Sequence, residues 1–424
     1  MLKHTNRRNF LKHAAAAAVA APAFLQAQNT GTKVNLGWVG LGIRGGRHIN
    51  TMLEVAGNDA HVKAICDTFS PRLAKSKDDV ITQQKSAPET YNDYYKMLGD
   101  KSIDAIMIFT PEHLHRDMAV AALEAGKHVY CEKPLTHTIE EGFDILRAVE
   151  KSGKKFQVGT QRRSSLLYKK AKEIYESGVL GKVTYARAFW YRNTPLLEPA
   201  WRYEIPADAD PQNTDYEKFL GKAPQTQFDK QRYFQWRLYW DYSGGISTDL
   251  LVHQTDALHM ITGRTHCESV MCNGGIHYWT EDDREVPDTI TAAFEYPNHF
   301  HINYSSMFNN QRYDYGEQLL GSEATMEIMG LQDLSVYPEK YQRASPQVAG
   351  RPEMHFNATK DFGQGNPTNE HLKNFIDAIK HNTPLACDAL TGHQAAVTGH
   401  LATLSYRNEK KAYWDNANGR YRFV

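Results

Sequence analysis

Apolar segments alternate regularly with helix-like segments between Lys33 and about Gln161. The apolar runs are "VNLGWVG", "HVKAICD", "IDAIMIF", "HVYCEKP" and "KFQVGTQ", and the stretches between them, such as "GGRHINTMLEVAG" and "TIEEGFDILRAVEKSG", have helical periodicity. Strands that alternate with helices in this way form a parallel sheet with helices on its two faces. We therefore predict an α/β domain with a doubly wound, Rossmann-type parallel sheet over residues 33–160.

The rhythm changes after this point, and 424 residues exceed the size at which a single core stops growing, so we expect a second domain over residues 161–424. A helical stretch "SLLYKKAKEIYESG" and a strand-like "KVTYARAFWYR" are followed by a polar loop from Asn193 to about Asn213. The later runs "DTITAAFEYP", "FHINYSSMF" and "EQLLGSEATMEIM" have period two, and the turn "PNH" predicts that the first two are antiparallel neighbours. Two helices, "NEHLKNFIDAIKH" and "GHQAAVTGHLATLSYRN", close the chain.

A glycine-rich turn follows the first apolar run and precedes the first helix. Its glycines, Gly40, Gly42 and Gly45, have the GxGxxG spacing, and Ile43 and Arg44 lie between the last two. The first glycine permits a tight turn, the second lets the backbone approach a pyrophosphate, and the third allows close helix packing. We predict that this turn binds a dinucleotide.

Asp67 ends the second apolar run at about the distance from the glycines where a carboxylate accepts hydrogen bonds from the adenosine ribose. This favours NAD over NADP. Arg72, just downstream, is the alternative, because it is suited to a 2′-phosphate.

Polar residues also follow two later runs, at the sheet edge where doubly wound folds bind ligands. Thr110 and Pro111 end one run, with His113 in the next turn, and Glu132 and Lys133 end another. The alternative interpretation of Glu132 and Lys133 is a surface salt bridge beside the turn-forming Pro134. The predicted cofactor-binding residues are Gly40, Gly42, Ile43, Arg44, Gly45, Asp67, Thr110, Pro111, His113, Glu132 and Lys133.

A second constellation lies in "WRLYWDYSGGISTDLLVHQTD". Asp249 and His253 are four residues apart on a predicted helix, and Asp256 falls three further along the same stripe. A histidine with a near-neutral pKa is suited to take a hydroxyl proton, and Lys133 is suited to hold the oxygen. An ordinary surface pair of aspartate and histidine is the alternative. Lys133, Asp249 and His253 are the predicted catalytic residues.

Aromatic residues crowd this stretch, and such residues suit a sugar ring as well as a core. Arg162, Arg163 and Arg192 are candidates for contact with substrate or acid groups, and of these we take Arg162. No third ligand accompanies Asp249 and His253, so we predict no metal. The predicted substrate-binding residues are Arg162, Trp240, Tyr242, Asp249 and His253.

Charge and cysteine content exclude several classes of protein. Lysine plus arginine equals aspartate plus glutamate, at 49 each, so no overall field attracts nucleic acid or an anionic membrane. The five cysteines are an odd and sparse set for a disulfide scaffold, and no CxxC or Cys/His cluster with the spacing of a structural zinc site is present. A small-molecule partner is expected, and no membrane span is predicted in the mature chain.

Residues 1–28 are predicted to be an export signal. Arg7 and Arg8 precede "FLK" and an alanine-rich apolar run that is too short and too weakly hydrophobic for a stable membrane span. This pattern is typical of a cleaved twin-arginine signal, and it predicts a periplasmic protein. An ordinary secretory signal or a basic tail is the alternative.

The combination of GxGxxG, a strand-end "TP", "CEKPLT", the DxxxH helix and "HLKNFIDAIKHNTPLACD" resembles the glucose-fructose oxidoreductase and inositol dehydrogenase family (Gfo/Idh/MocA). The resemblance covers essentially the whole mature chain. It implies a Rossmann domain followed by an α+β domain with a large, mostly antiparallel open sheet that often mediates oligomers, here a homodimer or homotetramer. It also implies that Lys133, Asp249 and His253 lie at the catalytic centre, with His253 as the acid/base, and that the substrate is a pyranose or cyclic polyol.

An exported enzyme that released NAD after each turnover would soon lack its cofactor, so we expect the cofactor to be tightly held. The leading hypothesis is an exported NAD-linked oxidoreductase that acts on a hydroxyl of a sugar or glycoside. A redox-neutral NAD-dependent glycosidase is the alternative, and it needs an additional base, for which Tyr242 and Asp256 are candidates. A non-catalytic sugar-binding protein is a third hypothesis, against which the intact glycines, Asp67 and Lys133 argue.

Overall fold

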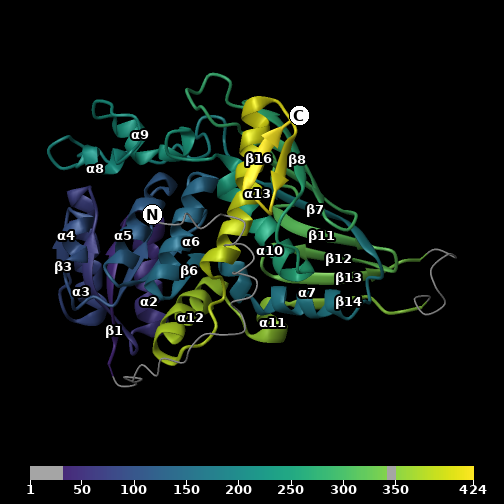
Figure 1. The fold of residues 1–424 in the computed structure, drawn as a ribbon, viewed down its shortest axis with the longest axis horizontal. Helices are drawn as coiled ribbons and strands as arrows, with labels where there is room; N and C mark the ends of the chain where they lie inside the picture. Colours follow the sequence, from purple (N-terminus) through teal and green to yellow (C-terminus); the bar gives the residue numbers. More distant parts are fainter. Residues whose placement is uncertain (1–31, 341–349) are drawn as a thin grey trace, which may run out of the picture.

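The computed structural model describes residues 32–340 and 350–424, which build two sheets with helices packed around them (Figure 1). The predicted export signal lies outside the described residues. Within them, no helix is long and apolar enough to cross a membrane. The five cysteines are all buried and free.

The first sheet is parallel, in the order β3-β2-β1-β4-β5-β6, which confirms the predicted doubly wound fold. Three-residue β3 was not predicted. The strands are β1 (Val34–Val39), β2 (Ala60–Cys66), β3 (Glu89–Tyr91), β4 (Ala105–Ile108), β5 (His128–Glu132) and β6 (Phe156–Gly159). The helices between them are α2 (Ile43–Ala56), α3 (Ser70–Gln84), α4 (Tyr94–Leu98), α5 (His115–Glu124) and α6 (Ile139–Ser152), and the short turn Glu112–Leu114 precedes α5.

Local sequence explains these elements. The four residues of β4 are fully buried on both faces, as central strands of a parallel sheet must be. Helix α6 begins with a capping box: the Thr138 hydroxyl accepts from the Glu141 backbone N–H, and the Glu141 carboxylate accepts from the Thr138 backbone N–H. The helix ends at Gly153, which has the left-handed conformation.

The second sheet has ten strands in the order β14-β13-β12-β11-β7-β10-β9-β8-β15-β16. All neighbours are antiparallel except β7 and β10, and the predicted β9–β10 hairpin is present with Phe300 opposite Tyr296. The large, mostly antiparallel sheet is therefore confirmed. The strands are β7 (Val183–Tyr191), β8 (Ser269–Gly275), β9 (Thr289–Tyr296), β10 (Phe300–Met307), β11 (Tyr315–Gly321), β12 (Ala324–Met329), β13 (Asp333–Pro338), β14 (Met354–Asn357), β15 (Ala412–Asp415) and β16 (Arg420–Phe423).

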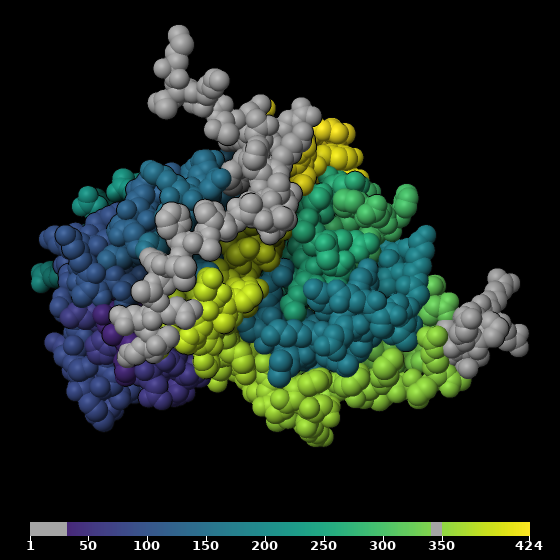
Figure 2. Space-filling model, turned by 60° about the horizontal axis from the view of Figure 1, so that its bottom comes forward, coloured from purple at the N-terminus to yellow at the C-terminus, as the bar shows by residue number. Residues whose placement is uncertain are grey.

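Helices that follow β6 in the chain pack around the two sheets, and one of them, α12, returns to the first sheet. Leu372, Phe375 and Ile376 of α12 pack into the same apolar cluster as β1, so this helix covers the Rossmann sheet although it follows the second sheet in the chain. In Figure 2 the yellow-green helix residues lie between the purple-blue and teal-green halves. The helices are α7 (Leu166–Glu176), α10 (Val252–Thr262), α11 (Ala358–Phe362), α12 (Pro367–His381) and α13 (Ala389–Asn408), with a short turn at Gln161–Ser164.

Residues 213–238, here called the cover segment, leave the second domain and pack on the Rossmann domain. The segment contains α8 (Tyr216–Leu220), α9 (Lys230–Phe234) and the turn Trp236–Leu238, and Figure 1 shows α8 and α9 beside α4 and α5. Ser70 N–H donates to the Asn213 carbonyl (2.9 Å), and Asp215 N–H donates to the Thr68 carbonyl (2.8 Å). The segment therefore lies across the end of β2, next to Asp67.

Candidate active site

A cavity of about 720 Å³ lies at the carboxyl ends of β1, β2, β4 and β5, where doubly wound folds bind ligands. It extends from the glycine turn of the Rossmann domain to the DxxxH helix of the second domain. Residues from both groups singled out in the sequence therefore face one space.

The glycine turn fits a dinucleotide. Gly40 has φ +84°, and an added Cβ there would lie 2.7 Å from the Phe109 backbone, whereas a Cβ on Gly45 would lie 1.8 Å from the Gly40 oxygen. On Gly42, by contrast, the nearest heavy atom to an added Cβ is Arg72 Nη1, 3.9 Å away. The open space at Gly42, at the start of α2, is where a pyrophosphate approaches a helix N-terminus.

Asp67 lies at the adenosine end of this cavity. Its two carboxylate oxygens accept from the backbone N–H groups of Leu41 (2.6 Å) and Phe69 (2.8 Å). The hydroxyl of Tyr233 in the cover segment lies 3.5 Å from Asp67 Oδ1 and 2.7 Å from the Thr68 hydroxyl. Carboxylate oxygens have further lone pairs, so ribose hydroxyls are still able to donate to Asp67.

The ends of β4 and β5 hold polar groups that face the cavity. Arg44 Nε lies 3.0 Å from Glu132 Oε2 and ties the glycine turn to the end of β5. Thr110 Oγ1 and Arg44 Nη2 are buried and have no hydrogen-bond partner in the described part of the chain, as expected for groups that await a ligand. Pro111 also lines the cavity.

Two histidines, His113 and His115, follow Pro111, and the structure places the predicted one, His113, away from the cavity. His113 lies outside the cavity lining: its Nε2 is 2.8 Å from the Phe219 carbonyl, and its ring packs on Tyr242. His115 lines the cavity instead, with ring nitrogens 2.8 Å from the Pro134 carbonyl and 3.0 Å from the Thr110 carbonyl. His115 therefore links the ends of two neighbouring strands.

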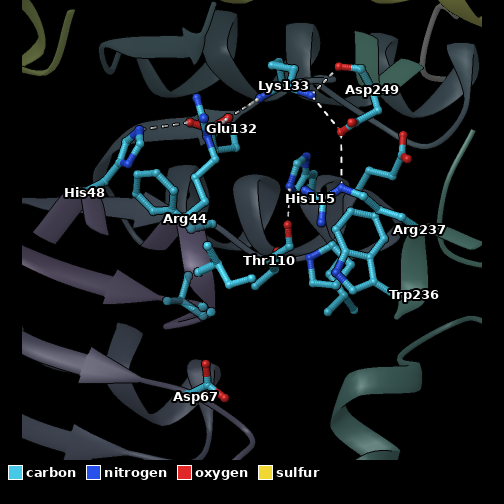
Figure 3. Close-up of a pocket in the computed structure, with 18 of the residues that line it drawn as sticks. Arg44, His48, Asp67, Thr110, His115, Glu132, Lys133, Trp236, Arg237 and Asp249 are labelled. Carbon is cyan, nitrogen blue, oxygen red and sulfur yellow. Dashed lines mark hydrogen bonds and ion pairs between the residues drawn. The ribbon is translucent and has the colours of Figure 1, made fainter. Parts of the chain in front are cut away.

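Lys133, Asp249 and Arg237 form a charged triad between the domains (Figure 3). Lys133 Nζ donates to the Asp249 carboxylate (3.0 Å) and to the Asp249 backbone carbonyl (2.7 Å), and Arg237 Nε donates to the same carboxylate oxygen (3.3 Å). Burial alone would raise the pKa of Asp249, but the charges of Lys133 and Arg237 hold it below its ordinary value. Burial lowers the pKa of Lys133, and Asp249 opposes this.

His253 enters the same cavity from α10. A π-helical turn, Ser247–Leu251, carries Asp249 and continues directly into α10, and both Asp249 and His253 line the cavity. Burial and the neighbouring charge of Lys133 lower the pKa of His253 well below its ordinary value. His253 is therefore neutral near pH 7 and is able to accept a proton.

Asp256 does not share this stripe, contrary to the sequence interpretation. It is buried outside the cavity lining and accepts from Arg163 Nε at 2.7 Å. The π-turn at Ser247–Leu251 changes the register between Asp249 and α10, so regular α-helical spacing does not relate Asp249 to Asp256.

Aromatic residues other than the predicted ones form the substrate end. Trp240 and Tyr242 lie outside the cavity lining: the Trp240 carbonyl contacts His137, and Tyr242 is fully buried against His113 and Phe219. Trp190 takes their place, with its ring centroid 5.5 Å from that of His253 and 4.6 Å from the stacked ring of Tyr315. The aromatic residues that line this end are Trp190, Trp201, Tyr203, Trp236 and Tyr315.

Arg162 lines the cavity as predicted, but its charge is committed to the protein. Only 3% of the residue is exposed, and it forms an ion pair with Glu317, which also accepts from the Tyr168 hydroxyl at 2.8 Å. The guanidinium lies over the Tyr315 ring, 5.0 Å from its centroid. Arg162 therefore packs against the aromatic residues that line this end of the cavity.

The sequence interpretation missed Arg237, Trp190 and Glu112. Arg237 stands in the aromatic stretch already singled out, and Trp190 is the penultimate residue of β7, so proximity to a strand end was the available signal. Glu112 follows Pro111 directly, and its Oε1 accepts from Gly244 N–H (2.9 Å) and the Thr248 hydroxyl (3.3 Å). It thus joins the Rossmann domain to the start of the catalytic helix.

Glu112 makes stability depend on pH. Burial raises its pKa to about 7, so the folded protein retains this proton at pH values where the unfolded chain has lost it. Stability should therefore fall as pH rises from the ordinary carboxyl pKa to about 7, by at most about 3 kcal/mol. In Glu112→Gln, which keeps an acceptor oxygen but cannot ionise, this loss should disappear. Urea unfolding with saturating NAD at about pH 5 and pH 8 measures this loss. Equal pH slopes in the wild type and the variant would refute it. Glu150→Gln, at an exposed glutamate outside the cavity lining, serves as control.

No group of three or more histidine, cysteine, aspartate or glutamate side chains in the described ranges is arranged to hold a metal ion. The triad contains one carboxylate and two cations, which is a poor donor set for a divalent metal. The residues gathered here suit binding of a dinucleotide and proton transfer.

A Rossmann domain whose glycine turn shares a cavity with a buried lysine and a neutral histidine defines a nucleotide-dependent oxidoreductase. The chain belongs to the Gfo/Idh/MocA oxidoreductase family. Residues 34–160 match the family's NAD-binding Rossmann domain, described as "Oxidoreductase family, NAD-binding Rossmann fold", and residues 223–413 match its C-terminal alpha/beta domain. The resemblance noted from the sequence is thereby confirmed at the level of the family.

Named relatives include inositol dehydrogenases. Inositol 2-dehydrogenase of Salmonella paratyphi B is 34% identical over 147 residues, which cover 34% of this chain and only 42% of that protein. Myo-inositol 2-dehydrogenase of Thermotoga maritima is 23% identical over 91% of this chain and 100% of its own. The solved structure of a levoglucosan dehydrogenase with NADH and levoglucosan has a TM-score of 0.69 at 18% identity, and the alignment covers 90% of this chain and 99% of that one, so it shares the fold.

Proposed function

We propose that this protein is an exported, NAD-dependent oxidoreductase that acts on a hydroxyl group of a sugar or glycoside and holds its cofactor tightly between turnovers. The observation that carries the proposal is the single cavity in which the glycine turn, Lys133 and His253 meet. The sugar-type substrates named for the inositol and levoglucosan dehydrogenases support the substrate class.

Lys133, Asp249 and His253 have different roles in the oxidation of the hydroxyl group. The nicotinamide, when bound, supplies an acceptor for the hydride. His253, neutral because burial and Lys133 lower its pKa, takes the hydroxyl proton. Lys133 has three ammonium protons, two of which go to Asp249, so one remains for the substrate oxygen and stabilises its developing negative charge. Asp249 orients Lys133 and keeps it protonated.

The cover segment supports tight retention of NAD. It reaches the adenosine end of the cavity through the hydrogen bond between Tyr233 and Thr68, and Phe234 stacks on Arg72 with the guanidinium carbon 4.8 Å from the ring centroid. A nucleotide beneath this segment leaves only when these contacts open. Retention is consistent with the export signal proposed from Arg7 and Arg8, because a folded, loaded protein suits the twin-arginine route.

We also propose a homo-oligomer. Residues along β9 alternate between buried and exposed, so one face of the ten-stranded sheet packs on helices and the other faces outward. Such a face offers a surface for a second copy of the chain.

The test uses the protein as purified, without added nucleotide. Heat denaturation should release about one NAD per chain, and mixing the intact protein with sugars and aryl glycosides should reduce that NAD once and then stop unless a second substrate accepts the hydride. Reduced-nicotinamide absorbance and aglycone release are followed together. Continuous aglycone release without net reduction of NAD would contradict this proposal and support the glycosidase. A purified protein that contains no NAD and does not bind added NAD would support the non-catalytic sugar-binding protein.

The positions of the additional bases considered for the glycosidase favour the oxidoreductase. Tyr242 is fully buried, and Asp256 is paired with Arg163, and neither lines the cavity.

A further inference from the structure

Most cations that line the cavity are already paired with carboxylates. Arg44 pairs with Glu132, Lys133 and Arg237 share Asp249, and Lys218 pairs with Asp215. Arg162 pairs with Glu317 beside the aromatic residues of the cavity. These charges are balanced within the protein and have little attraction left for an anionic ligand.

Arg192 is different. It follows β7 directly and lines the cavity, and its guanidinium forms no ion pair with any carboxylate in residues 32–340 and 350–424. Its backbone N–H donates to the Met307 carbonyl (2.9 Å), which fixes the start of the side chain. The guanidinium carbon lies 5.2 Å from the Trp190 ring centroid and 5.9 Å from that of Phe308. It is a half-buried, pre-positioned positive charge that forms no ion pair, although it acts electrostatically on Asp249 and Asp314.

Two other cavity arginines, Arg47 and Arg72, also lack a carboxylate partner in the described part of the chain. They belong to the Rossmann domain: Arg47 lies on α2 behind the glycine turn, and Arg72 Nη1 is the nearest atom to the space at Gly42. Their position suits them to bind the phosphates of the proposed nucleotide. Arg192 is contributed by the second domain and is free to bind the substrate.

The position of Arg192 relative to His253 defines what it would bind. Both residues flank Trp190: the His253 ring is 5.5 Å from the indole centroid, and the Arg192 guanidinium is 5.2 Å away. Arg192, Lys133 and Asp249 also line the same cavity. Because Tyr315 is stacked on Trp190, a pyranose fits in the cavity beside the indole, with one hydroxyl toward His253 and a ring substituent toward Arg192.

We propose that Arg192 forms a carboxylate-binding subsite, so that the substrate is an acidic sugar of the uronate type. A guanidinium offers paired N–H donors that match a carboxylate in a bidentate arrangement, and the half-buried setting strengthens the interaction relative to bulk water. This inference rests on the proposed function because it concerns the same site. It adds a residue that selects between acidic and neutral sugars.

The test is equilibrium binding to the NAD-loaded protein, followed by intrinsic tryptophan fluorescence, with D-glucuronate and D-glucuronamide as probes. The two differ only at C6, where the carboxylate of the first is replaced by a neutral carboxamide of similar shape in the second. Wild type should bind glucuronate at least about tenfold more tightly, in line with a charge-assisted pair. Arg192→Gln should lose this preference and Arg192→Lys should keep part of it. Arg312→Gln, which removes an exposed arginine stacked on Tyr313, is the matched control and should keep it all.

The outcomes separate this inference from the proposed function. A wild type that binds both probes equally, or an Arg192→Gln variant that still prefers glucuronate, would overturn the subsite. Preference for sulfated sugars over glucuronate would show that the subsite binds a different anion and would overturn the uronate assignment. If neutral sugars reduce the bound NAD and glucuronate is not preferred, the proposed oxidoreductase function stands and the subsite does not. If binding is selective for charge but no NAD is reduced, the subsite stands and the proposed function does not.

Discussion

Replacement of His253 by asparagine is expected to lower the rate of hydride transfer about 100- to 10,000-fold, the range for loss of a general base. His253 lines the cavity with its ring beside Trp190, and burial together with the charge of Lys133 keeps it neutral. Asparagine cannot accept the hydroxyl proton. The measurement is single-turnover reduction of the bound NAD by a sugar that the wild type oxidises.

Two further observations make this test specific. Because the pKa of His253 is lowered, the wild-type rate should stay constant through neutral pH and fall only in acid, as the imidazole becomes protonated. His259→Gln is the matched control, since His259 is also buried on α10 but bonds Tyr296 outside the cavity lining, and it should alter stability rather than the rate. An unchanged rate in His253→Asn, or a loss of bound NAD that accounts for the whole defect, would assign the proton transfer elsewhere.

The Rossmann half could be predicted because its signals are local. Each main strand is an apolar run of the kind that a buried parallel sheet requires, and the spacing of Gly40, Gly42 and Gly45 between the first strand and the first helix indicates the turn. Strand β3 escaped notice because Glu89 and Thr90 are exposed and the strand has only three residues. A strand at the sheet edge needs no apolar pattern, so its sequence resembles a loop.

The residues at the substrate end of the cavity could be predicted only in part, because tertiary contacts that leave no pattern in the sequence bring them together. Lys133, Asp249 and His253 were found because each stands at a strand end or on one helix face, and the cavity does contain them. Trp240 and Tyr242 were chosen for their nearness to Asp249 in the chain, but the chain turns through Gly244 and Gly245 before the helix and carries both away. Trp190, distant in sequence, reaches the site because β7 lies in the middle of the second sheet.

Replacement of Asp249 by asparagine is expected to destabilise the fold by about 3–5 kcal/mol, the usual cost of removing one partner from a buried ion pair. The side chains of Lys133 and Asp249 are only 7% and 13% exposed, so the variant leaves Lys133 and Arg237 near each other without an anion between them. Lys133→Met should cost less, because Asp249 keeps Arg237 as a partner. Urea unfolding of the NAD-loaded proteins measures both values.

The double variant Lys133→Met/Asp249→Asn decides what the pair contributes. It removes one positive and one negative charge together, so it should recover about 1–3 kcal/mol relative to the sum of the single variants. Strict additivity would mean that the two side chains do not interact in solution. If the double variant is folded and holds NAD but transfers no hydride, the buried pair is needed for chemistry: Asp249 then keeps an ammonium protonated in a site where burial lowers the pKa of Lys133. Full activity in that variant would instead remove Lys133 from the proposed mechanism and leave His253 to act on a substrate oxygen held by other donors.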